Sequence, residues 1–233
     1  MTAVDYRTAL IVGAGSGLSA SVARTFAAAG MNILLAARNV DKLGELARET
    51  RAKTFSCDAS DRAAVAGMFA AAAGQGAEPD VVVYNASYRQ RGPLIELDAA
   101  EVEKALRVTA YAGFLVAQEA ARRMLPHQHG AILFTGASAS IKGYAQSAPF
   151  AMGKFALRGL AQSMARELSP QGIHVAHFVI DGGIRSGRRA EPADRPHSLL
   201  DPDAIAATYL HVLQQPRSAW TWEVELRPWV EKF

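Results

Sequence analysis

The stretch "RTALIVGAGSGLSASVARTFAAAG", residues 7–30, decides the fold of this chain. Residues 7–15 form an apolar run that ends in glycine, which is typical of a buried strand, and residues 19–30 have the pattern of a helix. Three glycines lie in the turn between them: Gly13, Gly15 and Gly17. Such a turn lets the backbone approach a pyrophosphate at the positive end of the helix. Because Ser19 stands where a third glycine of the spaced motif is expected, the motif alone also fits a plain strand-to-helix turn.

The rest of the chain repeats this alternation of short apolar runs and longer helical segments. Strands are expected at 31–38, 53–58, 80–87 and 130–136, helices at 39–50, 61–74 and 99–125, and a further helix and strand within 149–180. Apolar strands that alternate with helices without gaps indicate a parallel sheet covered on both faces. We therefore predict a single doubly wound α/β domain over residues 1–233, with a central parallel sheet of about seven strands.

The composition is that of an ordinary globular protein. Half of the 233 residues are hydrophobic, and the formal net charge is +3. The basic residues are scattered rather than clustered, which argues against nucleic-acid binding. The single cysteine, Cys57, excludes an internal disulfide and fits a reducing compartment. No apolar run reaches the roughly 18 residues of a membrane span, and the N-terminus enters a strand without a signal sequence, so we expect a cytoplasmic protein that binds no membrane.

Two other kinds of chemistry do not fit the motifs. The six histidines show no spacing typical of a metal site, so we expect no metal. The glycine-rich segment 13–17 contains neither the serine of a nucleophile elbow nor the lysine of a phosphate-binding loop, which counts against an esterase and an NTPase.

The ends of the next strands favour one dinucleotide. A site restricted to NAD carries Asp or Glu at the end of the second strand, whereas this chain has Arg38 there and no acid. A guanidinium suits a 2′-phosphate, so NADP(H) is favoured over NAD(H), although a solvated loop arginine would look the same. Asp58 ends the third strand, where it can accept a hydrogen bond from the adenine amino group. Asn85 and Ala86 end the fourth strand and are expected near the adenosine ribose.

Along nearly its full length the chain resembles the short-chain dehydrogenase/reductase family. Residues 13–17 are similar to the glycine motif of that family, 84–87 ("YNAS") to its N-N-A-G strand end, and 150–154 ("FAMGK") to its Y-x-x-x-K motif. The Asp181-Gly182 pair falls near the family's P-G turn. The resemblance implies a Rossmann fold, a small-molecule substrate, and cofactor binding by Gly13, Gly15, Ser16, Gly17, Leu18, Arg38, Asp58, Asn85, Ala86, Lys154, Gly182 and Ile184.

The resemblance also implies an oligomer. Members of this family often assemble as tetramers through two long central helices. In this chain those helices are expected at about 99–125 and 150–169. We therefore expect a homo-oligomer, either a dimer or a tetramer.

The catalytic positions depart from the family pattern. Lys154 matches the lysine, but Phe150 stands where a tyrosine donates or accepts the proton, so the chain is similar to an atypical subgroup of the family that carries this change. The family's serine position falls on Ala137, with Ser138 adjacent, and its asparagine position falls on Thr109. Activity can therefore be carried over only in part.

Three interpretations of these departures remain open. The protein can reduce a carbonyl with a relocated proton donor, for which Tyr144 and Tyr111 are the candidates. It can instead reduce a conjugated C=C, where Ser138 or Thr109 would stabilise the enolate oxygen. As an alternative, Lys154 holds only the ribose and the protein is a non-catalytic NAD(P)-binding module or regulator. We predict an NADP(H)-dependent oxidoreductase that transfers hydride to a carbonyl or a conjugated C=C.

Arginines gather in two segments that border the substrate pocket in the resembling family. Residues 181–203 form a Gly-, Pro- and charge-rich loop, and a loop of that length inside a domain is usually functional. The arginines are Arg185, Arg188, Arg189 and Arg195 in this loop, with Arg89 and Arg91 after the fourth strand. They suggest a substrate with a carboxylate or phosphate, such as a CoA ester, although solvated loop charges are the more common explanation of such arginines.

Overall fold

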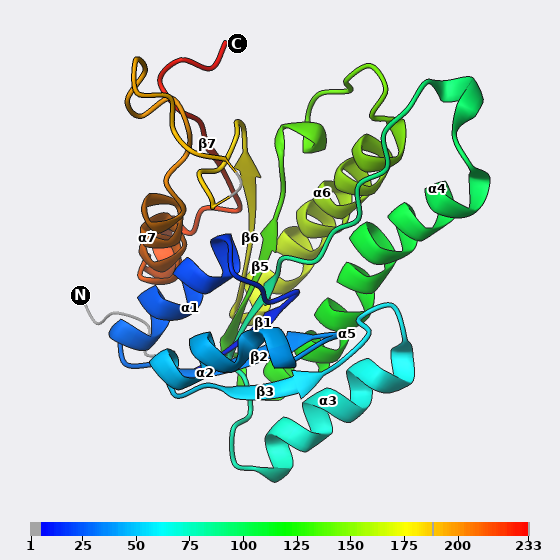
Figure 1. Cartoon of the computed structure of the whole chain (residues 1–233). Helices are drawn as coiled ribbons and strands as arrows, with labels where there is room; N and C mark the ends of the chain where they lie inside the picture. The colour runs from blue at the N-terminus through cyan, green and yellow to red at the C-terminus, as the bar shows by residue number, and fades with distance from the viewer. Residues whose placement is uncertain (1–5, 188, 233) are drawn as a thin grey trace.

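A parallel sheet forms the centre of the computed structural model, which describes residues 6–187 and 189–232 (Figure 1). Within these residues the sheet has seven strands in the order β3-β2-β1-β4-β5-β6-β7, and every neighbouring pair is parallel. The strands are β1 (Thr8–Val12), β2 (Asn32–Ala37), β3 (Lys53–Ser56), β4 (Val81–Tyr84), β5 (Gly130–Thr135), β6 (Ile173–Ile180) and β7 (Glu223–Leu226). The predicted doubly wound sheet is confirmed.

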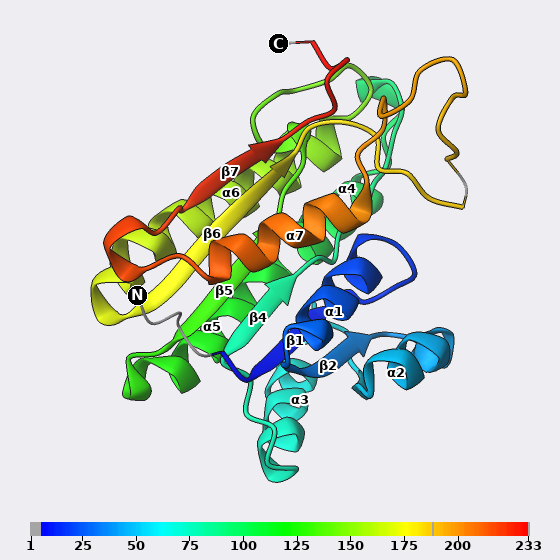
Figure 2. The same ribbon diagram turned by 90° about the vertical axis from the view of Figure 1, so that its left-hand side faces the viewer.

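Helices cover both faces of this sheet. They are α1 (Leu18–Ala28), α2 (Gly44–Thr50), α3 (Arg62–Gly74), α4 (Ala99–Leu106), α5 (Ala112–Met124), α6 (Ala148–Leu168) and α7 (Pro202–Leu213). Helices α3, α5 and α6 pack on one face, whereas α1, α2 and α7 pack on the other. Figure 2 shows α1 and α7 in front of the sheet, with α5 and α6 behind it.

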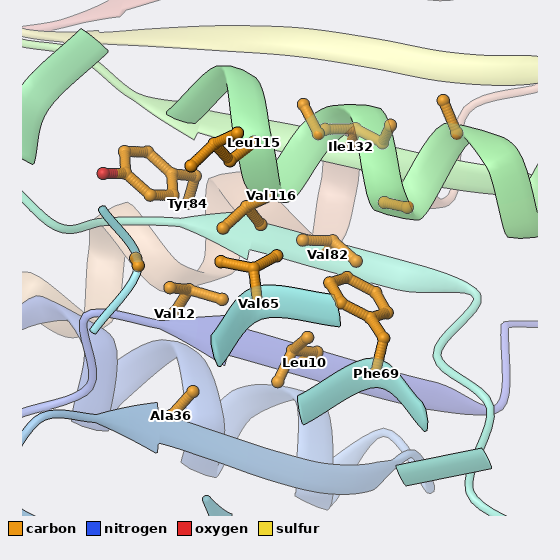
Figure 3. Close-up of a cluster of buried hydrophobic side chains, with 14 of the residues drawn as sticks. Leu10, Val12, Ala36, Val65, Phe69, Val82, Tyr84, Leu115, Val116 and Ile132 are labelled. Carbon is orange, nitrogen blue, oxygen red and sulfur yellow. The ribbon is translucent and has the colours of Figure 1, made fainter. Parts of the chain in front are cut away.

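Strand β1 shows why two cores form. Its five residues are all buried, and successive side chains point to opposite faces. Leu10 and Val12 join the core under α3 and α5, while Ala9 and Ile11 join the core under α1 and α7. Figure 3 shows part of the first core, in which labelled side chains of β1, β2, β4 and β5 meet those of α3 and α5. An apolar run without alternation therefore requires a layer of helices on each side.

The strand order reverses beside β1, which places a crevice at the carboxyl edge of the sheet. Strand β1 pairs with β2 on one side and with β4 on the other. In doubly wound sheets, ligands bind outside the carboxyl ends of the strands where the order reverses. The loops that follow β1, β4, β5 and β6 all leave from this edge.

The long helix expected at 99–125 is interrupted. Residues Arg107–Tyr111 form a π-helical turn between α4 and α5. The Tyr84 hydroxyl donates a hydrogen bond to the Val108 carbonyl, and the Tyr88 amide donates to Thr109 Oγ1 at 3.2 Å. These two bonds tie the turn to the end of β4 and to the loop after it, and such turns are frequent near functional sites.

The C-terminal part of the fold consists of α7 and β7. The sequence pattern assigned no bounds to α7 and β7, which lie after the long loop. No helix of the described residues combines the length and the apolar character needed to cross a membrane.

Candidate active site

Three cavities follow one another along the carboxyl edge of the sheet. The Arg38 cavity has a volume of about 370 Å³ and is bordered by Gly13, Arg38, Asp58, Asn85 and Ala86. The Lys154 cavity has a volume of about 340 Å³ and is bordered by Leu18, Ser138, Phe150, Lys154, Gly182 and Ile184. The arginine cavity has a volume of about 390 Å³ and is bordered by Arg89, Arg91, Tyr144, Ser147 and Arg189.

Shared residues join these cavities into one cleft. Asn85 and Ser87 line both the Arg38 cavity and the Lys154 cavity. Arg89, Ser138 and Gly182 line both the Lys154 cavity and the arginine cavity. The cleft therefore runs from the ends of β2 and β3, past α6, to the loop after β6.

The glycine turn has one closed and one open part. Gly13 has φ +83°, and a Cβ there would lie 2.5 Å from the Ala86 amide nitrogen, so only glycine fits. A Cβ on Gly15 or Gly17 would meet no atom within 4 Å. The Gly15 amide donates to Ser19 Oγ at 2.9 Å, so the serine at the third-glycine position ties the turn to α1. The open part has the room that a pyrophosphate needs.

The Arg38 cavity holds two charged groups of opposite sign. Arg38 is exposed at the end of β2 and forms no ion pair within the described part of the chain. Asp58 Oδ1 accepts from the Ser60 amide at 2.9 Å and from its hydroxyl at 2.8 Å. These two bonds, together with the charge of Arg38, hold the pKa of Asp58 below its usual range. Asp58 is thus an ionised acceptor at neutral pH.

Asn85 links this cavity to the glycine turn. Its side-chain amide donates to the Gly13 carbonyl at 3.3 Å. Ala86 packs against Gly13 from the same strand end. The ends of β1 and β4 are therefore held together where the Arg38 cavity meets the Lys154 cavity.

Lys154 is a buried charged group in the middle of the cleft. It lies on α6, is 3% exposed, and donates from Nζ to the Thr135 carbonyl at 2.6 Å. Burial lowers the pKa of its ammonium group to about 8. A lysine that is buried with one neutral acceptor marks a functional position more often than a structural one.

Phe150 lies one turn before Lys154 and faces the same cavity. Lys154 Nζ is 5.8 Å from the Phe150 ring centroid, and Arg89 Cζ is 4.8 Å from it. Both cations therefore interact with one aromatic ring. The ring has no proton to donate, so any proton donor at this site is a different group.

The other predicted catalytic residues divide into two groups. Ser138 lines both the Lys154 cavity and the arginine cavity, and Tyr144, which is 44% exposed, lines the arginine cavity. Thr109 is fully buried behind the π-helical turn, where its hydroxyl accepts from Tyr88. Tyr111 is exposed on the outer side of the same turn and stacks on Phe114. Neither Thr109 nor Tyr111 lines any of the three cavities.

The predicted cofactor residues are spread over the cleft and a neighbouring hollow. Ser16 and Gly17 line a fourth cavity of about 590 Å³ beside the start of α1. Gly15 lines none of these four cavities. All other predicted cofactor residues border the Arg38 cavity or the Lys154 cavity.

A buried hydrogen-bond chain behind the cleft was missed by the sequence analysis. His177 Nδ1 is 3.1 Å from Glu223 Oε2, and His177 Nε2 is 3.3 Å from Ser140 Oγ. Glu223 also accepts from Arg158 at 2.6 and 2.8 Å, and Ser140 Oγ accepts from the Ala137 amide at 3.1 Å. No sequence signal connects residues on β6, β7 and α6 that lie so far apart in the chain.

The pKa of His177 and the carboxylate of Glu223 determine where the protons lie in this hydrogen-bond chain. Burial lowers the pKa of His177 to about 4, so the ring is neutral at pH 7. The Glu223 carboxylate only accepts, which requires the proton on Nδ1 and leaves Nε2 to accept from the Ser140 hydroxyl. The chain thereby holds the turn that carries Ser138 against the sheet.

Comparison with known proteins shows which family has this architecture. Residues 7–193 match the family model described as short chain dehydrogenase. The chain is 32% identical over 210 residues to the cyclic-di-GMP-binding biofilm dispersal mediator protein of Escherichia coli (strain K12), covering 86% of this chain and 84% of that protein.

Two solved structures show the same fold over nearly the whole chain. The short-chain dehydrogenase from Rhodopseudomonas palustris is 36% identical, with a TM-score of 0.82 over 96% of this chain and 99% of that chain. A metagenomic short-chain oxidoreductase in complex with NADP is 27% identical, with a TM-score of 0.84 over 97% of this chain and 99% of that chain. The protein therefore belongs to the short-chain dehydrogenase family of oxidoreductases, for which NAD(P) is the typical cofactor.

Proposed function

We propose that the protein is an NADP(H)-dependent oxidoreductase that transfers hydride to a carbonyl or a conjugated C=C of a small organic substrate. The observation that carries the proposal is the buried Lys154 in a cleft that continues without a break to Arg38. NADP(H) supplies the hydride when it is bound. The chain itself supplies the groups that bind and orient the reactants.

The residues of the cleft fit this cofactor. The open part of the glycine turn would take the pyrophosphate, and Arg38 would pair with the 2′-phosphate. Asp58 would accept from the adenine amino group, while Asn85 and Ala86 would contact the adenosine ribose. Lys154 would hold the nicotinamide ribose, with Leu18, Gly182 and Ile184 enclosing that end. The complex of a 27% identical relative with NADP supports the choice.

Phe150 takes the position of the family's catalytic tyrosine in this proposal, which restricts the proton donor. General acid catalysis contributes about 10²–10⁴ in rate, so ketone reduction needs a replacement. Tyr144 is the candidate whose side chain lines the cleft, and Ser138 is placed to donate to a developing oxyanion. Reduction of a conjugated C=C makes a smaller demand, because water can protonate the enolate at carbon.

A second candidate function is nucleotide binding without turnover. It is favoured by the E. coli relative, which is 32% identical and is described as a cyclic-di-GMP-binding mediator. In that case Lys154 and Arg38 serve binding alone.

A single assay separates these candidates. NADPH consumption is measured against matched panels of ketones and conjugated enones for wild type, Phe150→Tyr and Lys154→Met. We expect turnover by wild type on one panel, loss of that turnover in Lys154→Met, and a gain of ketone reduction in Phe150→Tyr of up to about 10². NADPH binding without turnover by wild type, with ketone reduction only in Phe150→Tyr, would instead support the binding module.

We further propose that the protein forms a homo-oligomer through α5 and α6. Four large hydrophobic side chains on these helices and the π-helical turn are exposed: Tyr111, Phe114, Met152 and Phe155. Exposed apolar residues that gather on adjacent elements mark an interface. Light scattering should give a mass above that of one chain, and a monomer at micromolar concentration would contradict the proposal.

A further inference from the structure

Three arginines from two distant parts of the chain converge on one cavity. Arg89 and Arg91 follow β4, Arg189 lies in the loop after β6, and all three line the arginine cavity of about 390 Å³. Arg188 lies outside the described residues. Of the remaining predicted arginines, Arg185 pairs with Asp201 at 2.7 Å, and Arg195 does not line this cavity.

The fold holds two of these arginines in place. Arg89 lies over the Phe150 ring at 4.8 Å. Arg189 lies across Gly183, where a Cβ would be 2.7 Å from its guanidinium, and its backbone exchanges two hydrogen bonds of 3.0 Å with Ser186. Arg189 is exposed, and the glycine under its side chain and the tight turn at its base restrict where its guanidinium lies.

The cavity has more positive charge than its carboxylates balance. Asp181 and Glu231 also line it, but the Asp181 carboxylate is already bound by Lys142 at 3.0 Å and Arg227 at 3.2 Å. Within the described residues, none of Arg89, Arg91 and Arg189 forms an ion pair. Burial and the charges of Arg91 and Arg189 together lower the pKa of Arg89. The arginines therefore repel one another, and a bound anion would relieve this repulsion.

A buried hydroxyl in the same cavity also lacks a partner. Ser147 is 3% exposed, and its Oγ makes no hydrogen bond within the described part of the chain. It precedes α6 and lines the arginine cavity. A buried hydroxyl without a partner costs about 1–3 kcal/mol, so an acceptor group that entered the cavity would be stabilised by it.

We propose that Arg89, Arg91 and Arg189 form a subsite for a carboxylate or phosphate group of the substrate, with Ser147 as an additional donor. This inference rests on the proposed function, because it makes the arginine cavity the outer part of the reaction site. Arg89 and Lys154 contact the same Phe150 ring, so one short molecule can reach both. The substrate class is then a short-chain acid whose reducible carbon lies toward Lys154 and whose anionic group lies toward Arg89.

Equilibrium binding tests the subsite without needing the reaction. Hexanoate, hexyl phosphate and the neutral hexanamide are titrated by calorimetry into wild type, Arg189→Gln and Arg89→Gln, each with and without saturating NADPH. We expect wild type to bind at least one of the two anions about tenfold or more tightly than the amide, and each variant to lose that preference. The preferred anion identifies carboxylate or phosphate as the substrate group.

Arg195→Gln is the matched control, because Arg195 lies in the same loop outside the cavity. It should keep the preference of wild type, and Arg189→Gln should keep the affinity for NADPH. Equal binding of the anions and the amide by wild type, or an unchanged preference in Arg189→Gln, would overturn the subsite. A wild type that prefers an anion but does not bind NADPH would leave the subsite standing and refute the proposed function.

Discussion

The Arg38 cavity and the arginine cavity lie at the two ends of one cleft, and they differ in how their polar groups are held. At the first end, Asp58 accepts from Ser60, Asn85 donates to the Gly13 carbonyl, and Gly13 packs on Ala86. Backbone and short side chains satisfy one another there, and the exposed Arg38 is the group of this end that forms no ion pair within the described residues. At the second end, three arginines form no ion pair and the Ser147 hydroxyl forms no hydrogen bond within the described residues.

This difference shows which end the protein completes by itself. The first end is a preformed shape, so its ligand needs to match a surface. The second end has an excess of positive charge, so its ligand needs to carry a negative charge. Lys154 lies between them and combines both properties, since it is buried in the fold and retains an ionisable group.

The largest effects are expected at the preformed end, from replacing Gly13 or Gly15 with alanine. Gly13→Ala should destabilise the protein by about 3–5 kcal/mol, because its Cβ would overlap the Ala86 backbone at a positive φ. Gly15→Ala is the control, and its Cβ meets nothing within 4 Å. It should change stability by less than about 1 kcal/mol but weaken NADPH binding about tenfold. Urea denaturation and NADPH titration measure both effects. If Gly15→Ala keeps full affinity for NADPH, the pyrophosphate does not bind at the open part of the glycine turn.

Lys154 tests the cost of keeping a charge in the middle of the cleft. Because its pKa is about 8 in the folded protein and higher in the unfolded chain, the unfolded chain binds more protons between these values. The free energy of unfolding of wild type should therefore rise with pH from about 8 to about 10, relative to Lys154→Met. Near pH 7 the methionine variant should be more stable by about 3 kcal/mol, and the gap should close at high pH.

Paired urea denaturation curves of wild type and Lys154→Met from pH 7 to pH 10 measure this gap. All other groups titrate in both proteins, so their contributions cancel in the difference. A gap that stays constant over this range would mean that Lys154 is not buried as an ammonium. If the methionine variant is as stable as expected, the same data would show that a loss of turnover in Lys154→Met does not come from unfolding.

The smallest expected effect concerns the choice of dinucleotide. Arg38→Ala should weaken NADPH binding about tenfold and leave NADH binding unchanged, because the lost charge-assisted hydrogen bond involves only the 2′-phosphate. Arg48→Ala, which removes an exposed arginine of α2, is the control and should change neither affinity. Equal affinity of wild type for NADH and NADPH would contradict the proposal that Arg38 binds the 2′-phosphate.

Much of the fold could be predicted because its signals are local. Apolar runs and glycine turns identified β1 to β6 and both helical layers, and Arg38 and Asp58 were found at strand ends where a parallel sheet gathers them. The last helix was missed although Asp201 and Pro202 carry a helix-start signal, with the Asp201 side chain accepting from Asp203 at 3.0 Å.

The site was predicted less completely, because some of its residues meet only through the fold. Thr109 falls on the family's asparagine position, yet the π-helical turn and the bond from Tyr88 hold its hydroxyl away from the cleft. His177 and Glu223 are 46 residues apart and pair only because β6 and β7 are neighbours in the sheet. Neither arrangement has a sequence period that would reveal it.

The sequence by itself determined the layered α/β architecture, the glycine turn and the position of Lys154 four residues after Phe150. These follow from periodicity and backbone chemistry, which act between near neighbours in the chain. The tertiary structure alone decided that Arg89 and Arg189 share a cavity, that Asp181 is neutralised by Lys142 and Arg227, and that the Ser147 hydroxyl is buried without a hydrogen bond to the described residues. Electrostatic balance depends on distances between segments remote in sequence, and only the folded sheet sets those distances.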